Sequence, residues 1–376
     1  MEIDCEYSTP ASPPGKQTAL MPTTTSHSMA VSSARTQLAD FLGDNGSPHQ
    51  IRHDEGLKAL RHFQEATCHT FGGDMITQVM HQVVRNNVWQ YPFLTHMVIA
   101  VSSGHQRRLS GQSSQMKRLR SLEFEEINHW QTGLQMFQSK LSRQTSGSEP
   151  ELMNFDSVVS AIFLTIVFTL AMQDGNVESR SMKQGEYFVQ RIIDPMSSTG
   201  GFRALQAIQV TPSENSVWMS ALDTADDPNG TFTSRTPGTE GLPTAFVQLC
   251  ELDEHSSSDT NAFHAILRHL TPLIQMKPTP RNWSKLFAFS GRLHSTFRPL
   301  VAEKNPQTLL LLAWWLALLR QVDEWWIRAW AKSACESTVA YLSTTTDSRV
   351  QSLLVFPATF GTADISWIWR HELDST

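Results

Sequence analysis

Residues 305–320 read NPQTLLLLAWWLALLR. Asn305 is a favourable helix cap, and Pro306 suits the first helical turn because the N–H that it lacks is not needed there. The eleven residues from Leu309 to Leu319 are all apolar, so a helix made of them has no polar face to turn toward water. Such a helix must be covered on every side, which predicts a large all-α core.

A second apolar stretch, Ser157 to Gln173, also contains no charged residue. A membrane-spanning helix needs roughly 20 apolar residues, and both stretches are shorter. Lys304 and Arg320 close the first stretch at its two ends. We therefore predict two buried core helices and no membrane, with Asn154 capping the second helix.

The remaining segments after residue 50 follow the spacing of three and four residues that is typical of amphipathic helices. One stripe begins at Pro92 and ends at His105, and another lies between Gln115 and Leu141. Further helices are predicted at residues 60–71, at 74–84 with Asp74 as the cap, and at 245–252, 262–270 and 283–297, with a Trp-rich apolar surface along 309–342. The predicted fold class is all-α, a large domain of packed amphipathic and buried helices.

Two segments lack this periodicity. Residues 8–49 are rich in Ser, Thr, Pro and Gly and bury too little apolar surface to fold alone, so we expect a disordered linker. Residues 195–241 contain many Gly, Pro and Asp residues and predict a long loop or insertion. The predicted organisation is a short N-terminal part, 1–50, followed by a helical domain, 51–376.

Charge and cysteine content restrict the function. The formal net charge is −6, whereas proteins that bind nucleic acid by themselves carry a basic patch. The four cysteines are scattered, without a Cys-x-x-Cys pair, which predicts neither a disulfide framework nor a self-contained zinc site. The N-terminus carries Glu2 and Asp4 and no apolar core of a signal peptide, so we expect the nucleus, or else the cytoplasm.

Catalytic motifs are scarce. The sequence contains no phosphate-binding loop, dinucleotide fingerprint, nucleophile elbow or His-Glu-x-x-His helix. The acidic clusters Asp226-Asp227 and Asp253-Glu254-His255 lie in turn-rich segments and are interpreted as solvated charges. No catalytic, cofactor-binding or metal-binding residue is assigned, and the sequence favours a function other than catalysis.

The positions of the histidines and cysteines also predict no catalytic or metal-binding site. His264 and His269 are five residues apart on a predicted helix and therefore lie on different faces. Cys68 and His69 are adjacent, so their side chains are expected to diverge, and His96 and His105 are interpreted as packed or hydrogen-bonded residues of their helix.

Two surfaces leave alternatives open. The basic residues Arg107, Arg108, Lys117, Arg118 and Arg120 would either bind phosphates or an import receptor, or form a solvated connection between helices. The Trp-rich segment near the C-terminus would either line an apolar small-molecule pocket or simply fill the core.

Several segments resemble the regulatory domain of fungal binuclear zinc-cluster transcription regulators, in the branch of the sterol-uptake regulators. Cys5-Glu6-Tyr7 is similar to the last Cys-x-Tyr of the six-cysteine cluster that precedes this domain. The resemblance continues, in the family's order, through Pro92–His105, His129–Phe137, Phe155–Met172, Asn305–Leu319 with Asp323–Trp326, and Leu353–Pro357.

The resemblance implies a transcription regulator of a fungal metabolic gene set, such as a secondary-metabolite or lipid pathway, acting in the nucleus. Partners would be a second copy or another regulator, and an apolar ligand is a further expectation. The other five cluster cysteines would precede Met1, so zinc and DNA binding are expected only if an upstream cluster exists. Two alternatives stay open. One is a headless interaction protein, that is, one that lacks the DNA-binding zinc cluster, and the other is a helical scaffold recruited as a biosynthetic enzyme on an apolar metabolite.

Overall fold

The computed structural model describes residues 49–110, 116–145, 153–172, 214–219, 221, 236–292 and 297–369. Within these ranges the regular structure is helical and contains no strand, which confirms the all-α class. The chain divides into two units, Met1–His53 and Asp54–Thr376, and nearly all described residues belong to the second. The Cys5-Glu6-Tyr7 segment, the predicted linker up to residue 48, the Asp226-Asp227 pair and most of the predicted 195–241 loop lie outside the described residues.

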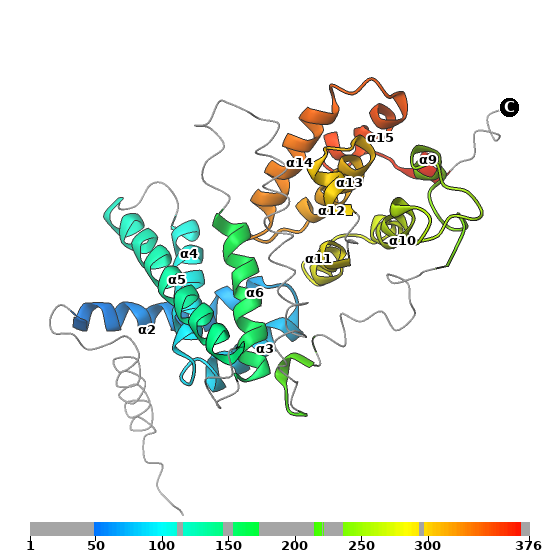
Figure 1. Ribbon diagram of the computed structural model, residues 1–376. Helices are drawn as coiled ribbons and strands as arrows, with labels where there is room; N and C mark the ends of the chain where they lie inside the picture. Colours follow the sequence, from blue (N-terminus) through cyan, green and yellow to red (C-terminus); the bar gives the residue numbers. More distant parts are fainter. Residues whose placement is uncertain are drawn as a thin grey trace, which may run out of the picture. The chain divides into compact units, whose positions relative to one another are not determined.

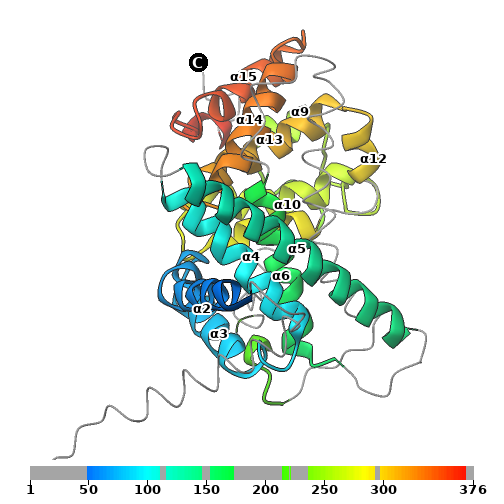
Figure 2. The ribbon, with the colours of Figure 1, turned by 90° about the vertical axis from the view of Figure 1, so that its left-hand side faces the viewer.

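The first group of helices is drawn in blue to green in Figure 1. Its central pair is α4 and α5, which lie side by side in both views, and α6 also packs on α4 (Figures 1 and 2). The members of this group are α2 (His49–Glu65), η1 (Thr67–Thr70), α3 (Asp74–Asn86), α4 (Pro92–Leu109), α5 (Met116–Thr145) and α6 (Phe155–Met172).

Two glycines let α4 and α5 approach each other closely. A Cβ atom on Gly133 of α5 would lie 2.9 Å from the carbonyl oxygen of Phe93 in α4. A Cβ atom on Gly104 of α4 would lie 2.6 Å from a carboxylate oxygen of Glu126 in α5. The α4–α5 contact therefore depends on the absence of side chains at these two positions.

Among the described helices, α6 alone has the length and the apolar composition to cross a membrane. However, 83% of it is buried within the protein. Asn154 caps it by accepting a hydrogen bond from the backbone N–H of Asp156 at 2.7 Å, as predicted. Inside the helix, the Ser160 hydroxyl accepts a hydrogen bond from the indole of Trp218 at 2.8 Å, and Phe168 stacks on Trp130 of α5 with ring centroids 3.9 Å apart. The burial expected of a core helix is thus found.

The second group of helices, yellow to red in Figure 1, surrounds α13. Helix α13 contacts α10, α11, α12, α14 and α15, which explains why its sequence has no polar face. Asn305 caps it, accepting from the N–H of Thr308 at 3.0 Å. The members of this group are α9 (Thr244–Leu249), α10 (Ala262–Gln275), α11 (Trp283–Arg292), α12 (Phe297–Ala302), α13 (Pro306–Arg320), α14 (Arg328–Leu342), α15 (Ser348–Ala358) and η3 (Ser366–Trp369).

Large aromatic side chains fill this second group. Trp314 and Trp315 are both fully buried, and each indole N–H donates to a backbone carbonyl, at 2.8 Å to Leu353 and at 2.7 Å to Leu286. Trp314 also stacks on Phe356 with centroids 4.3 Å apart. These indoles therefore bury their rings without leaving the N–H group unpaired.

One predicted detail is wrong. Helix α3 is capped by Gly73, and Asp74 is its first residue, because Gly72 and Gly73 have positive φ angles that turn the chain just before it. Of the helix predicted over 283–297, the structure describes α11 up to Arg292 and the first residue of α12, Phe297, and the residues between them lie outside the described ranges. Trp325 and Trp326 precede α14, which begins at Arg328.

Candidate functional site

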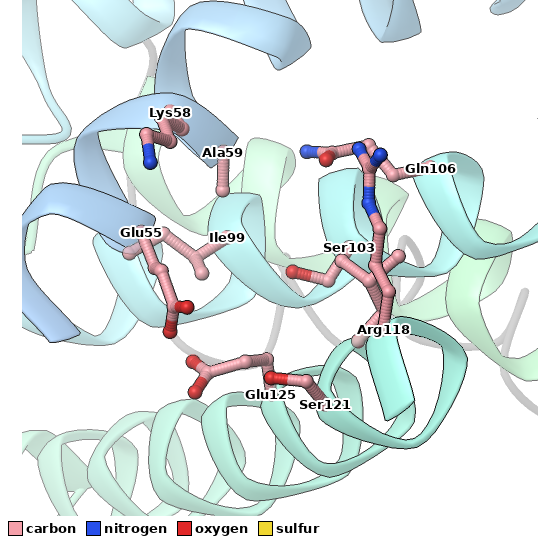
Figure 3. Close-up of a pocket in the computed structure, with 10 residues that line it drawn as sticks. Glu55, Lys58, Ala59, Ile99, Ser103, Gln106, Arg118, Ser121 and Glu125 are labelled. Carbon is pink, nitrogen blue, oxygen red and sulfur yellow. The ribbon is translucent and has the colours of Figure 1, made fainter. Parts of the chain in front are cut away.

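A cavity of about 290 Å³ lies between α2, α4 and α5 (Figure 3). Most of its lining residues are of polar or charged types, although their aliphatic parts also form much of the wall. Figure 3 shows the carboxylates of Glu55 and Glu125 on one side and the side chains of Gln106 and Arg118 on the other. Lys58, Ala59, Ile99, Ser103, Ser121 and Leu122 complete the lining. This arrangement suits a polar ligand with both donors and acceptors.

A chain of hydrogen bonds leads from this cavity into the seam between α4 and α5. The carboxylate of Glu125 lies 3.1 Å from Nε2 of His129, and Nδ1 of His129 lies 2.8 Å from Nδ1 of His96. Both imidazoles are buried. Burial, with His129 beside it, lowers the pKa of His96 to about 3, so His96 is neutral near pH 7. One of the two facing Nδ1 atoms must then carry a proton and the other must accept it.

The two arginines of α4 are partly buried and pair with a carboxylate of α5. The Nε atom of Arg107 donates to the carboxylate of Glu126 at 2.7 Å, and Arg108 approaches the same carboxylate at 3.6 Å. Glu126 is 1% exposed, so this ion pair is a core feature of the α4–α5 contact. Arg108 also donates to the carbonyl of Ala171 at the end of α6 and lies over the ring of Trp325. Arg107 and Arg108 thus belong to the α4–α5 contact, whereas Lys117, Arg118 and Arg120 are exposed.

A second group of histidines surrounds His105. Its Nδ1 atom lies 3.0 Å from the hydroxyl of Thr67 and 3.3 Å from Nε2 of His62. The ring stacks on Trp325 with centroids 5.0 Å apart and an interplanar angle of 16°. Burial, together with His62 and Arg108, lowers the pKa of His105 to about 4. His105 is thus a packed, hydrogen-bonded residue, as the sequence indicated.

Cys68, His69 and His81 come together beside η1. The Sγ atom of Cys68 lies 3.5 Å from Nε2 of His81, and the rings of His69 and His81 meet edge to face with centroids 5.4 Å apart. The ligand atoms of all three side chains lie within 4.8 Å of one another. The prediction that the side chains of Cys68 and His69 diverge is wrong: Cys68 is buried and His69 exposed, but their ligand atoms lie within 4.8 Å of each other. His81 of α3 bridges them, because it contacts both.

The other candidates from the sequence have structural roles. Asp253 sits in an exposed turn, where its carboxylate accepts from the N–H of His255 at 3.0 Å and from the hydroxyl of Ser256 at 2.8 Å. Nε2 of His264 lies 3.0 Å from the carbonyl oxygen of Gly238 inside the protein. His269 lies half-buried on another face of the same helix, α10, so the two histidines do not meet.

Cys250 and Cys335 are buried thiols. Burial raises the pKa of each to about 12, so neither is a nucleophile near neutral pH. The sequence missed the residues that the fold brings together. Glu125 and His129 could have been recognised as an i, i+4 pair on one helix. His81, thirteen residues after Cys68, gave no comparable signal.

Comparisons with known protein families, with curated proteins and with solved structures find no match for this chain. The fold and the cavity therefore define the class of protein only as far as a large all-α protein with a polar interhelical cavity.

Proposed function

We propose that the chain is a transcription regulator of the fungal zinc-cluster type, represented by its all-helical regulatory domain and acting in the nucleus on a metabolic gene set of a secondary-metabolite or lipid pathway. One observation carries this proposal. Among the described residues, the segments that resemble the family lie in helices or in the turn before α14, and these helices pack against one another.

The details of packing support the resemblance. Pro92–His105 forms the buried part of α4, and His129–Phe137 is the part of α5 that faces it across Gly133. Phe155–Met172 coincides with α6. In the second group, Asn305–Leu319 is the cap and body of α13, and Leu353–Pro357 lies in α15, which packs on α13.

The cavity at Glu55 and Glu125 adds a place where an effector would act. A small polar ligand bound there would contact α2, α4 and α5 together and stabilise one arrangement of these helices. A regulatory domain needs such a differential contact, because a ligand shifts a conformational equilibrium only by its difference in affinity for the two states.

A tethering experiment tests the proposal without an upstream DNA-binding segment. The chain is fused to a heterologous DNA-binding domain, and the transcription of a reporter gene is measured beside the transcriptome of a deletion strain. We expect a change in reporter output and a coherent change in a metabolic gene set. A fusion that is folded but inert, together with an unchanged transcriptome, would overturn the proposal.

A second candidate function, a headless interaction protein, is favoured by the outer face of α5. Met116, Phe124 and Ile127 are 68%, 58% and 37% exposed on this face. Arg120 and Glu123 lie among them, and the face forms a hollow of about 320 Å³. In an antiparallel two-fold pairing of α5 with a second copy, Met116 faces Ile127 and Arg120 faces Glu123, so the charges are complementary.

The occupant proposed for this face is therefore a second copy of the chain. Sedimentation over a range of concentrations should then show a monomer–dimer equilibrium. A strictly monomeric protein at high concentration excludes this second function, and a stable complex only with a different regulator would show that the face serves another partner.

A further inference from the structure

The cluster of Cys68, His69 and His81 has the geometry of an incomplete tetrahedron. Zinc binds thiolate sulfur at about 2.3 Å and imidazole nitrogen at about 2.0–2.1 Å, so two such ligands of a tetrahedral ion lie about 3.5 Å apart. The distance from Sγ of Cys68 to Nε2 of His81 is 3.5 Å. One edge of the coordination tetrahedron is thus already present.

The third ligand needs only a side-chain rotation. A nitrogen of His69 lies within 4.8 Å of both other ligand atoms, so a shift of at most roughly 1.3 Å brings it to the same spacing. His69 is exposed, so part of its side chain faces solvent. The exposed position also leaves an open side toward solvent.

The backbone that carries the cluster is fixed by its own hydrogen bonds. The carbonyl oxygen of Cys68 accepts from the hydroxyl of Thr77 at 3.2 Å and from the N–H of Phe71. Thr77 and His81 are four residues apart on α3, so the helix face that is tied to η1 is the face that presents His81. Cys68 and His81 are therefore held in register before any ion binds.

Three indoles from the second group of helices hold η1 in place. Trp325 donates to the hydroxyl of Thr70 at 2.8 Å, and Trp326 donates to the carbonyl of Thr70 at 3.0 Å. Trp283 donates to the carbonyl of Phe71 at 2.5 Å. Such support from outside the ligand set is typical of a preorganised metal site.

We propose that Cys68, His69 and His81 bind a zinc ion, with the fourth position taken by water or an exogenous ligand. The donor set of one thiolate and two imidazoles suits a borderline-soft divalent ion and disfavours magnesium or calcium, which prefer oxygen ligands. This site is separate from the cysteine cluster that would precede Met1, and it does not depend on the proposed function.

Zinc binding at this site releases a proton and is opposed by one neighbouring positive charge. The Cys68 thiol must release its proton to the solvent as the Zn–S bond forms, since only the thiolate is a ligand. Arg85 opposes the approach of a cation, so the site is expected to bind less tightly than a fully anionic one.

Cobalt(II) titration of the full-length protein tests the proposal, because a bound thiolate produces a charge-transfer absorption and a four-coordinate ion produces intense visible bands. We expect one equivalent of cobalt with both signatures, displaced by zinc. Cys68→Ser should abolish the charge-transfer band, and His81→Gln should weaken binding by at least about tenfold.

Three control variants separate this site from other ligands. Cys5→Ser, Cys250→Ser and Cys335→Ser remove the other cysteines and should leave the cobalt spectrum and affinity unchanged. If Cys68→Ser fails to fold, His69→Gln provides the test, because its side chain is exposed. Weak six-coordinate cobalt bands without charge transfer, or an affinity that is equal in wild type, His69→Gln and His81→Gln, would overturn the proposal.

Discussion

The helices α2–α6 and the helices α9–α15 pair their buried polar groups differently. In the second group the indole N–H of Trp314 and of Trp315 donates to a backbone carbonyl, and both partners are neutral. In the first group titratable side chains pair with one another, as in the contact between His96 and His129 and the ion pair of Arg107 with Glu126.

This difference teaches where the protein can respond to its surroundings. Neutral hydrogen bonds inside an apolar core do not change with pH, whereas buried imidazoles and ion pairs do. Glu324, a buried carboxyl between α13 and α14, is an exception in the second group: burial raises its pKa to about 8, so the unfolded chain releases this proton at a lower pH than the folded protein does. Its contribution to stability is therefore lost as the pH rises toward 8. The cavity and the Cys68–His69–His81 cluster both lie in the first group.

The largest effect is expected from Trp314→Ala. Trp314 is fully buried, stacks on Phe356 and donates to Leu353, so the variant leaves a large cavity. We expect a loss of about 4 kcal/mol in the free energy of unfolding, measured by urea denaturation, and the same loss at pH 5.5 and pH 7.5. Trp89→Ala, which truncates a half-buried tryptophan, should cost less than half as much. A loss that varies with pH would break the comparison.

Glu126→Gln tests the ion pair of the first group. The carboxylate is buried and receives Arg107 at 2.7 Å, but Arg107 retains some exposure, which reduces the penalty of losing its partner. We expect a loss of about 2–3 kcal/mol in the free energy of unfolding. Glu123→Gln, at an exposed position of the same helix, should change it by less than about 0.5 kcal/mol. Equal losses in the two variants would show that burial of the Glu126 carboxylate does not determine its effect on the free energy of unfolding.

His96 of the first group should contribute to the loss of stability in acid. His96 has a folded-state pKa of about 3, below the value of about 6.5 expected in the unfolded chain, so the unfolded chain binds the proton first as the pH falls. The contribution of His96 to the free energy of unfolding is therefore fully present above about pH 6.5 and is lost progressively toward pH 3. At pH 5 the loss from this histidine is about 2 kcal/mol.

His96→Gln should remove this contribution, so that its unfolding free energy changes less between pH 7.5 and pH 5 than that of the wild type. His255→Gln, in an exposed turn, is the matched control and should keep the wild-type slope. An unchanged slope in His96→Gln would place the acid sensitivity elsewhere in the protein.

The smallest effect on stability is expected from Phe124→Glu on the outer face of α5. An exposed substitution should change the free energy of unfolding by less than about 0.5 kcal/mol, while a charge in the proposed two-fold contact should shift a monomer–dimer equilibrium to monomer. Val355→Glu on α15, also at an exposed apolar residue, should leave the sedimentation profile unchanged. Equal effects of the two variants would exclude the α5 face as the contact.

Much of the fold was readable from local patterns. The caps Asn154 and Asn305 and the apolar stretches after them predicted α6 and α13, because capping and the lack of a polar face are properties of neighbouring residues. The start of α3 was not predicted, because the backbone geometry at Gly73 decided it.

The site was much less predictable. The Glu125–His129 contact lies within one helix and follows from the i, i+4 spacing. The approach of His96 from α4 required the two helices to be packed in a particular register, which Gly133 permits. Similarly, nothing in the spacing of Cys68 and His81 indicated that α3 turns back onto η1.

The sequence by itself determined that this protein is all-α and that its most apolar helices are buried, because hydrophobic periodicity and helix caps act over a few residues. Only the tertiary structure decided which polar side chains meet. The positions of Arg107 against Glu126 and of Cys68 against His81 depend on how separate helices pack, and that packing is set by the sum of many weak contacts across the core.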